Sequence, residues 1–532
     1  MAAAVRVIGR PVRVMRRPVR HPGFIVWLAL IMGAALLPRG EARAQSVLNY
    51  HGAPSRSGGY VMPGLTSARA AGIHSDPAFD GRVDGNIYAQ PLFWKSPKTN
   101  RPLLLVATED DIVYALDARS GKVVWRKALG HPVKRSALPC GNISPLGITG
   151  TPVIDDAKAA IYLDAMVDAE DGSGPQHLVF GLAVDDGSVL PGFPVNVALA
   201  LKARGLTFTP VVQNERGALA IVDRTLFIPY GGHYGDCGPY HGWVVGIPLD
   251  DPHTVSAWST RAEGGGVWAP GGISYDGHSM FVSTGNTKDA QDWSDGEAVF
   301  RLGTDLKAST SSRDFFAPAD WKDLDDSDRD LGGTNPLPID LPDGGGVTRL
   351  ILALGKDGKA YLLNRDNLGG IGGALAVEQV ARSAIITAPA LYIAPDGGAL
   401  VAFEGRGSGC GEGTFGRLRD LLGSSSGADL VVLRIQAHPS PAISTAWCGS
   451  AGGRGAPIVT TTAGGSNPIV WMVGAGGDNR LHGFRADTGD PVFTGGGATD
   501  AMVGLRHFVT ILAADGRLFI AGDDRIYAFT PD

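Results

Sequence analysis

Cysteine is scarce in this sequence, and no cysteine motif of a bound cofactor occurs. The 532 residues contain only four cysteines, Cys140, Cys237, Cys410 and Cys448. No Cys-x-x-Cys-His motif is present, which excludes covalent attachment of a c-type haem, so we expect no haem. The sequence also lacks a Cys-x-x-Cys pair and a His-Glu-x-x-His motif, so it contains neither of these zinc-binding patterns. The sequence therefore gives no sign of a haem protein or a zinc protease.

Long hydrophobic runs are also lacking, apart from one near the N-terminus. The apolar run 24–37 is shorter than the ~20 residues that a transmembrane helix needs. Six arginines lie before Gly23, and the small-x-small pattern 42–44 follows the apolar run. This order is typical of a secretory signal peptide over residues 1–44, with an uncleaved anchor as the alternative. We expect a mature chain of residues 45–532, exported to the periplasm or the medium, without a membrane span.

Basic segments are missing from the rest of the chain. Residues 1–44 hold eight of the 47 Lys and Arg residues and one of the 53 Asp and Glu residues, so residues 45–532 carry a net charge of −13. An acidic chain without a basic stretch argues against nucleic acid as a partner and against an anionic membrane surface.

What the sequence does contain is a recurring strand–turn–strand pattern. The segment 114–125 has close counterparts at 180–190 and 482–493, and its first half ends the chain at 526–532. Such a unit cannot bury its own faces and has to stack against copies of itself. We count eight units, with no convincing amphipathic helix among them. The sequence predicts one all-β domain, an eight-bladed propeller, with seven or nine blades as alternatives.

The eighth unit, from about residue 506, is one strand short. The segment 46–87 can supply that strand, so we expect the N- and C-terminal segments to share a blade and leave no free sheet edge. A second irregularity is the acidic stretch 323–330, which lacks the residue order of a calcium loop. We interpret it as a solvated acidic loop, with a bound cation as the alternative.

The segment 114–125 resembles the repeat of pyrroloquinoline-quinone (PQQ) proteins. These are eight-bladed propellers that include alcohol dehydrogenases and non-catalytic scaffolds, so the repeat indicates a fold and not an activity. Two further segments are more specific. The stretch 268–286 is similar to the active-site strand pair of the quinoprotein alcohol dehydrogenases, and 354–365 is similar to the strand whose cation contacts the quinone.

This resemblance implies roles for three residues. Trp268 would lie flat under PQQ, Asn286 would bind calcium, and Lys356 would contact the quinone. An aromatic floor and a cation suit a flat conjugated ring that carries carboxylates. A hard cation with oxygen ligands would polarise the quinone carbonyl.

The chain departs from the dehydrogenase pattern in three places. Where the dehydrogenases have two adjacent cysteines, this chain has only Cys140. Their calcium-binding glutamate falls near Asp236, which would take its place with a shift of one residue. Their catalytic aspartate falls near Gly303, and Asp305, two residues on, is a weak candidate for the base. His241, at a strand entry, is a second weak candidate.

Each candidate also has a structural interpretation. Trp268 can fill a blade interface, and Asn286 and Asp236 can be turn residues. Lys356 can be a solvated residue of a hairpin turn. His241 can hold a structural hydrogen bond.

The resemblance also bears on the cysteines. An even number of cysteines in an exported chain favours two disulfides. Cys140 and Cys237 fall in the two segments that approach the quinone pocket of the dehydrogenases, so we expect them to be bonded to each other. Cys410 and Cys448 flank the sixth unit and would form the second bond. Both bonds would restrain long loops.

A closer resemblance covers nearly the whole mature chain. The segments 85–91, 143–152, 238–243 and 477–484 are similar to a group of exported bacterial PQQ-repeat-like propellers. Two functions are implied as alternatives. The first is a binding or scaffold propeller whose top face holds a small molecule, a glycan or a protein. The second is a PQQ- and Ca²⁺-dependent alcohol or sugar dehydrogenase that passes electrons to an external carrier.

Overall fold

The computed structural model describes residues 9, 46–343, 345–408, 410 and 428–531. Apart from residue 9, the predicted signal peptide lies outside these residues. Helices are few and short in the described part of the chain, and none of them is long and apolar enough to cross a membrane. They are α1 (Ser67–Ala70), α2 (Val197–Lys202) and α3 (Trp321–Asp326), with the 3-10 turns η1 (Tyr50–Gly52), η2 (Arg135–Ala137), η3 (Pro210–Val212), η4 (Leu331–Gly333), η5 (Ala463–Gly465) and η6 (Ala498–Asp500).

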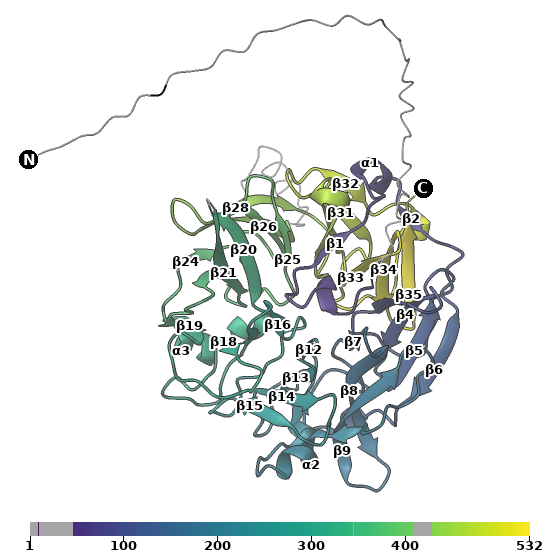
Figure 1. Cartoon of the computed structure of the whole chain (residues 1–532), viewed down its shortest axis with the longest axis vertical. Coiled ribbons are helices and arrows are strands. Elements are labelled where there is room, and N and C mark those ends of the chain that lie inside the picture. Colours follow the sequence, from purple (N-terminus) through teal and green to yellow (C-terminus); the bar gives the residue numbers. More distant parts are fainter. Residues whose placement is uncertain (1–8, 10–45, 344, 409, 411–427, 532) are drawn as a thin grey trace, which may run out of the picture. The chain divides into compact units, whose positions relative to one another are not determined.

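Eight sheets follow one another around a central axis, as predicted (Figure 1). The first is β3 (Leu92–Lys95), β4 (Pro102–Ala107), β5 (Ile112–Asp117) and β6 (Val123–Ala128). The second is β7 (Val153–Asp155), β8 (Ala160–Ala169), β9 (Gly174–Ala183) and β10 (Val195–Asn196). The third is β11 (Gln213–Asn214), β12 (Ala220–Val222), β13 (Thr225–Gly232), β14 (Trp243–Pro248) and β15 (Ser256–Ser259). The fourth is β16 (Ser274–Tyr275), β17 (Met280–Ser283), β18 (Val299–Leu302), β19 (Phe315–Ala317) and β23 (Gly370–Ile371).

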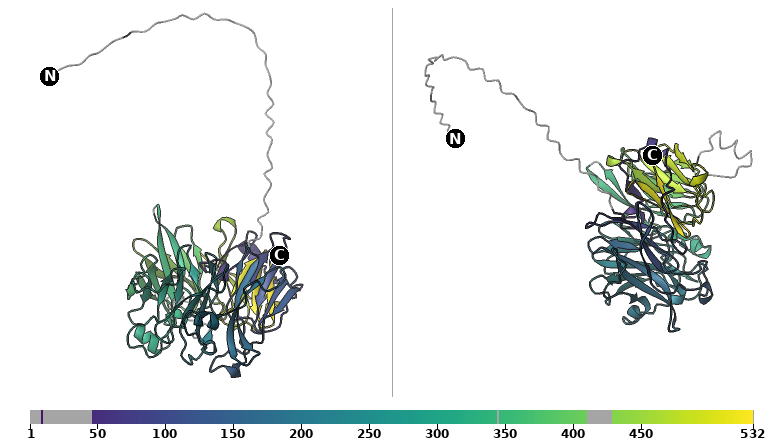
Figure 2. Two further views of the ribbon diagram at one scale, coloured as in Figure 1. Left: turned by 60° about the horizontal axis from the view of Figure 1, so that its bottom comes forward. Right: turned by 90° about the vertical axis from the view of Figure 1, so that its right-hand side faces the viewer.

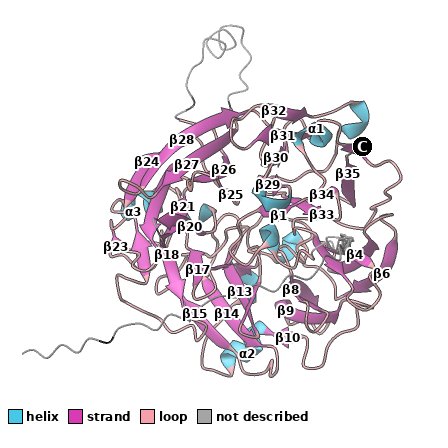
Figure 3. Ribbon diagram, turned by 45° about the horizontal axis from the view of Figure 1, so that its top comes forward, coloured by secondary structure: helices cyan, strands magenta, loops and turns pink. Residues whose placement is uncertain are grey.

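The remaining four sheets complete the ring, which is seen from other sides in Figures 2 and 3. The fifth is β20 (Leu337–Asp343), β21 (Gly346–Leu354), β22 (Lys359–Asn364) and β24 (Ala376–Gln379). The sixth is β25 (Ala390–Ile393), β26 (Ala399–Glu404), β27 (Leu430–Gln436) and β28 (Ala442–Gly449). The seventh is β1 (Gly59–Val61), β29 (Ile458–Thr461), β30 (Ile469–Val473), β31 (Leu481–Arg485) and β32 (Pro491–Thr494). The eighth is β2 (His74–Ser75), β33 (Ile511–Ala514), β34 (Arg517–Gly522) and β35 (Arg525–Thr530).

The ring closes as the sequence predicts. His74 and Ser75 of β2 pair antiparallel with Thr530 and Phe529 of β35, so the N-terminal segment supplies the missing strand of the eighth blade. The same segment pairs a second time, where β1 runs parallel to β29 in the seventh blade. The two ends of the propeller are therefore held together by backbone hydrogen bonds.

The recurring strand–turn–strand segment forms the outer hairpin of a blade and packs against the preceding blade. In the second blade, Gly187 lies against the ring of Trp125 from the first blade, and the Trp125 indole donates to the carbonyl of Val184 at 2.9 Å. The Trp447 indole of the sixth blade makes the same bond to Ala486 of the seventh, at 2.8 Å. Gly489 of the seventh blade lies against Trp447 in the same way, whereas Gly121 of the first blade lies against the backbone of Asp80 and Gly81, so the copies in the second and seventh blades share the tryptophan contact.

The hydrophobic core is divided into layers between neighbouring blades. Leu105 of β4 and Leu163 of β8 belong to the layer between the first two blades, and both are buried. Comparable layers separate the second from the third blade, the third from the fourth, the fifth from the sixth and the sixth from the seventh. Each blade therefore depends on both neighbours for the burial of its two faces.

The segment 46–61 lies near the middle of the ring, where it is drawn in purple in Figure 1. It bonds to one blade after another, beginning with the bridge between Val47 and Phe93 in the first. Arg56 is fully buried; its Nε donates to the Ile273 carbonyl at 2.9 Å and its Nη2 to the Leu219 carbonyl at 2.7 Å, beside the inner strands of the fourth and third blades. The segment thus ties the inner ends of the blades together.

We expect Arg56→Met to lower the free energy of unfolding by about 3 kcal/mol, because two buried carbonyls lose their donors and each costs about 1–3 kcal/mol. Denaturant unfolding of the mature protein measures the change. Arg82→Met is the matched control, since Arg82 is an exposed arginine paired with Asp80. Equal midpoints for the two variants would contradict a structural role for Arg56.

A second prediction concerns pH. His51 is fully buried beside Arg56, and burial, followed by the Arg56 charge, lowers the pKa of His51 to about 3. Below about pH 6.5 the unfolded chain takes up a proton that the folded chain does not, so this histidine makes the unfolding free energy fall by ~1.4 kcal/mol per pH unit as the pH drops. His51→Gln is expected to remove that part of the slope between pH 6 and pH 4. Identical slopes for both proteins would contradict it.

Candidate functional site

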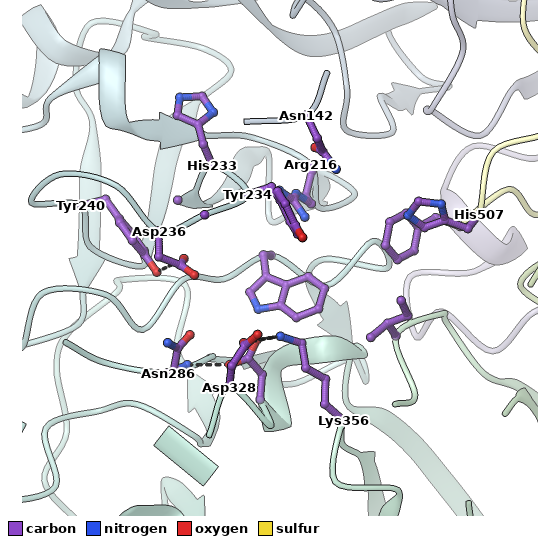
Figure 4. A pocket seen from close by; sticks show the side chains of 16 residues that line it. Asn142, Arg216, His233, Tyr234, Asp236, Tyr240, Asn286, Asp328, Lys356 and His507 are labelled. Carbon is purple, nitrogen blue, oxygen red and sulfur yellow. Dashed lines mark hydrogen bonds and ion pairs between the residues drawn. The ribbon is translucent and has the colours of Figure 1, made fainter. Parts of the chain in front are cut away.

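A pocket of about 360 Å³ lies at the face of the ring where the loops ahead of the inner strands meet, which we call the upper face. Arg216 precedes β12, Trp268 precedes β16, Asp330 precedes β20 and Phe508 precedes β33. Other lining residues come from the loops between the second and third strands of the third, fourth and fifth blades (Figure 4). Because the blades repeat, equivalent loops of successive blades each contribute a side chain to this pocket.

Four residues that the sequence singled out line this one pocket. They are Trp268, Lys356, Asn286 and Asp236. They come from three blades, and 120 positions separate the first from the last in the chain, Asp236 from Lys356. The structure therefore brings them together, although their individual roles stay predictions.

Trp268 is half-buried, and its indole faces cations. The Lys356 Nζ atom lies 5.2 Å from the centroid of the Trp268 ring, and the Arg216 Cζ atom lies 5.8 Å from it. Gly285 lies directly against the indole, since a Cβ there would come within 2.8 Å of Trp268 Nε1. An aromatic face with positive charges nearby is suited to a flat, electron-rich or anionic ligand.

Lys356 is held by two carboxylates. Its Nζ atom lies 2.6 Å from Asp328 and 2.7 Å from Asp330, and its backbone N–H donates to the Asp330 carbonyl. Asp330 also accepts from the backbone N–H of Asn286 at 3.0 Å. Burial raises the pKa of Asp330, and the Lys356 charge opposes that rise. Burial tends to lower the pKa of Lys356, but the two carboxylates raise it above its ordinary value, so the ammonium stays charged.

The acidic stretch 323–330 is only in part the solvated loop that the sequence suggested, since Asp323, Asp326 and Asp328 are exposed. Its first half lies in α3, and Asp325 and Asp330 are buried. Asp330 is a pocket residue that the sequence analysis missed. The sequence did offer one signal, the density of carboxylates just ahead of an inner strand. In this fold the loop ahead of an inner strand lies near the axis.

The donor set does not form the calcium site that the resemblance implies. Asp236 accepts the Tyr240 hydroxyl at 2.6 Å, and Asp330 is paired with Lys356. Among the described residues no group of three or more His, Cys, Asp and Glu could hold a metal ion. Calcium binds six to eight oxygens, so Asp236 and Asn286 fall short of what it needs.

Two other candidates lie away from the pocket. Asp305 follows β18 in an exposed turn, and its carboxylate pairs with Lys307 at 2.8 Å. It is therefore not placed to act as a base at Trp268. The Nδ1 atom of His241 lies 3.1 Å from the Thr260 carbonyl, which is the structural hydrogen bond that was its alternative interpretation.

Both predicted disulfides are present. Cys140 and Cys237 are bonded with a Cα–Cα distance of 6.0 Å, and Cys410 and Cys448 with one of 5.7 Å. The first bond joins the loop ahead of β7 to the loop between β13 and β14. That second loop carries Tyr234, whose side chain is 66% exposed beside the pocket. The disulfide therefore restrains one wall of the site.

The comparison with solved structures agrees with this architecture. The quinohemoprotein alcohol dehydrogenase of Pseudomonas putida HK5 aligns over 91% of this chain and 80% of its own, with a TM-score of 0.59 and 12% identity. The quinohemoprotein alcohol dehydrogenase of Comamonas testosteroni aligns over 92% of this chain and 82% of its own, with a TM-score of 0.59 and 14% identity. A europium-containing methanol dehydrogenase aligns over 90% of both chains, with a TM-score of 0.53 and 12% identity.

The chain has the fold of an eight-bladed β-propeller, like that of the quinoprotein dehydrogenases. At 12–14% identity the likeness shows the fold and not the activity. No protein-family model matches the sequence, and no curated protein sequence matches it significantly. What this quinoprotein-like propeller does has to be argued from its pocket.

We expect Lys356→Met to lower the free energy of unfolding by about 3 kcal/mol, because it leaves the buried Asp330 carboxylate without its countercharge. The double variant Asp330→Asn with Lys356→Met is expected to recover most of that loss. Denaturant unfolding measures both. Lys322→Met is the control, since its partner Asp326 is exposed. Additive losses in the double variant would contradict the pairing.

Proposed function

We propose that this propeller binds a small, flat, anionic molecule in its upper-face pocket, and that PQQ belongs to the class that it takes. The observation that carries this proposal is the Trp268 indole with the Lys356 Nζ atom 5.2 Å from its ring centroid, both in the lining of one pocket of about 360 Å³. That volume lies in the range of ligand sites, about 300–1,000 Å³. A glycan or a protein would need a broad surface, whereas these residues converge on a confined space.

The chemistry of the pocket suits PQQ itself. PQQ is a conjugated ring system with carboxylates, so Trp268 would stack on its face and Lys356 would supply a positive charge at its edge. Residues 45–532 would act outside the cytoplasm, in the periplasm or the medium, which fits the two disulfides.

Asp330 favours a second candidate function, the oxidation of an alcohol or a sugar. It is a buried carboxylate in the pocket, and its pKa is raised by burial, as a general base requires. In such a reaction Asp330 would take the proton of the substrate hydroxyl. Bound PQQ would supply the two-electron acceptor, and an external carrier would then accept the electrons.

We expect the mature protein to bind PQQ with a shift of the quinone absorption band and a rise in melting temperature. Binding at 100 times the Kd adds about 2.7 kcal/mol to the stability. Trp268→Ala and Lys356→Met are expected to weaken binding at least ~10-fold, whereas Lys322→Met leaves it unchanged. No binding at high micromolar PQQ, with or without Ca²⁺, would rule PQQ out.

Dye reduction with a panel of alcohols and sugars then separates the two functions. If the protein is a dehydrogenase, Asp330→Asn abolishes turnover but retains PQQ binding. If PQQ binds and no substrate reduces the dye, the binding function alone remains.

A further inference from the structure

Arg216 is a second cation of the pocket, and the sequence analysis missed it. It lies between β11 and β12, and its guanidinium points toward the interior of the pocket (Figure 4). Among the described residues, it makes no hydrogen bond and no ion pair, and its Nε atom is buried without a partner. Arg216 as a whole is half-buried, and a partly buried guanidinium without a bonded partner is costly, so its presence calls for an explanation.

The carboxylates near Arg216 do not neutralise it by contact. Glu109 accepts from the backbone N–H of Gly147 at 2.8 Å, and Glu215 accepts from that of Gly150 at 3.1 Å. Burial raises the pKa of Glu109 to about 7 and raises that of Glu215 well above its ordinary value. Both acids thus bond to backbone N–H groups and not to the guanidinium. Asp236, whose charge acts most strongly on Arg216, accepts the Tyr240 hydroxyl at 2.6 Å instead.

Other cations around the pocket have partners inside the protein. Lys356 pairs with Asp328 and Asp330, and Arg506 pairs with Asp523 at 2.7 Å. Arg135 donates to the carbonyls of Gly141 and Leu138. Arg216 differs from them in having no hydrogen bond or ion pair among the described residues.

Two further arginines, Arg454 and Arg506, act on the same wall as Arg216. His507 lines the pocket, and burial together with the charges of Arg454, Arg216 and Arg506 lowers the pKa of His507. The aspartates of the pocket lie elsewhere in its lining, and two of them, Asp328 and Asp330, are paired with Lys356, so the arginines dominate the field at this wall. Such a local field attracts an anion and is strengthened by low-dielectric walls.

We propose that Arg216 is a carboxylate-binding residue and that the pocket selects ligands carrying a carboxylate on a flat ring. The inference rests on the proposed function for the ring, which would lie against Trp268. The 5.8 Å between Arg216 Cζ and the Trp268 ring centroid places both contacts within reach of one small aromatic acid. A guanidinium binds a carboxylate through two parallel N–H···O bonds, which gives selectivity over a neutral group.

The test compares three probes: PQQ, naphthalene-2-carboxylate, and the neutral naphthalene-2-methanol of similar shape. Calorimetry and thermal melting are measured on the mature wild-type protein, on Arg216→Met and on Arg454→Met. Arg454 is an exposed arginine that shares the local field but does not line the pocket. It is the control for charge alone.

We expect the wild type to bind the carboxylate at least ~10-fold more tightly than the alcohol. Arg216→Met is expected to remove that preference, and Arg454→Met to change it less than ~3-fold. The free Arg216→Met protein should melt at the same temperature as the wild type or higher, because a buried unpaired charge has been removed.

Several results would overturn the inference. They are equal affinity of the wild type for acid and alcohol, equal losses in the two arginine variants, or a clearly lower melting temperature of free Arg216→Met, which would indicate a structural role. If the acid binds through Arg216 and PQQ does not bind, the assignment of PQQ fails and the carboxylate site stands. If PQQ binds to Arg216→Met as to the wild type and the acid does not bind, the carboxylate site fails and the assignment of PQQ stands. Failure of both probes overturns both proposals.

Discussion

Apolar packing between neighbouring blades is the interaction on which everything else in this structure depends. A single blade has two faces to bury and no core of its own, so Leu105 and Leu163 are buried only because the first and second blades are adjacent. The ring must therefore be complete. The N-terminal segment completes it by the pairing of β2 with β35, and its buried Arg56 also bonds carbonyls beside two inner strands.

The same packing creates the pocket. Because every blade begins with an inner strand, the residue just ahead of that strand is directed toward the axis. Arg216, Trp268 and Asp330 come from three different blades and reach one cavity for this reason. The disulfide between Cys140 and Cys237 then restrains the wall that carries Tyr234. A rigid ring thus supports loops whose sequences differ from blade to blade, and these different side chains give the pocket its aromatic and charged groups.

The pocket contains two cations, Lys356 and Arg216, beside three aspartates. Lys356 is neutralised by Asp328 and Asp330, whereas Arg216 has no such partner among the described residues. The two cations lie at similar distances from the Trp268 ring, 5.2 and 5.8 Å. This arrangement distinguishes the site from the calcium-dependent pattern to which its sequence is similar, since Asp236 accepts the Tyr240 hydroxyl and Asp330 is paired with Lys356.

The sequence alone determined the blade repeat, its strand–turn–strand unit and the closure by both ends, because these follow from local periodicity and turn residues such as Gly187. The resemblance to quinoproteins added the cysteine pairs and the residues Trp268 and Lys356. Only the tertiary structure showed that Asp330 and Arg216 enter the pocket while Asp305 does not. No periodic signal marks them, since their position at the axis depends on how several blades pack and not on neighbours in the chain.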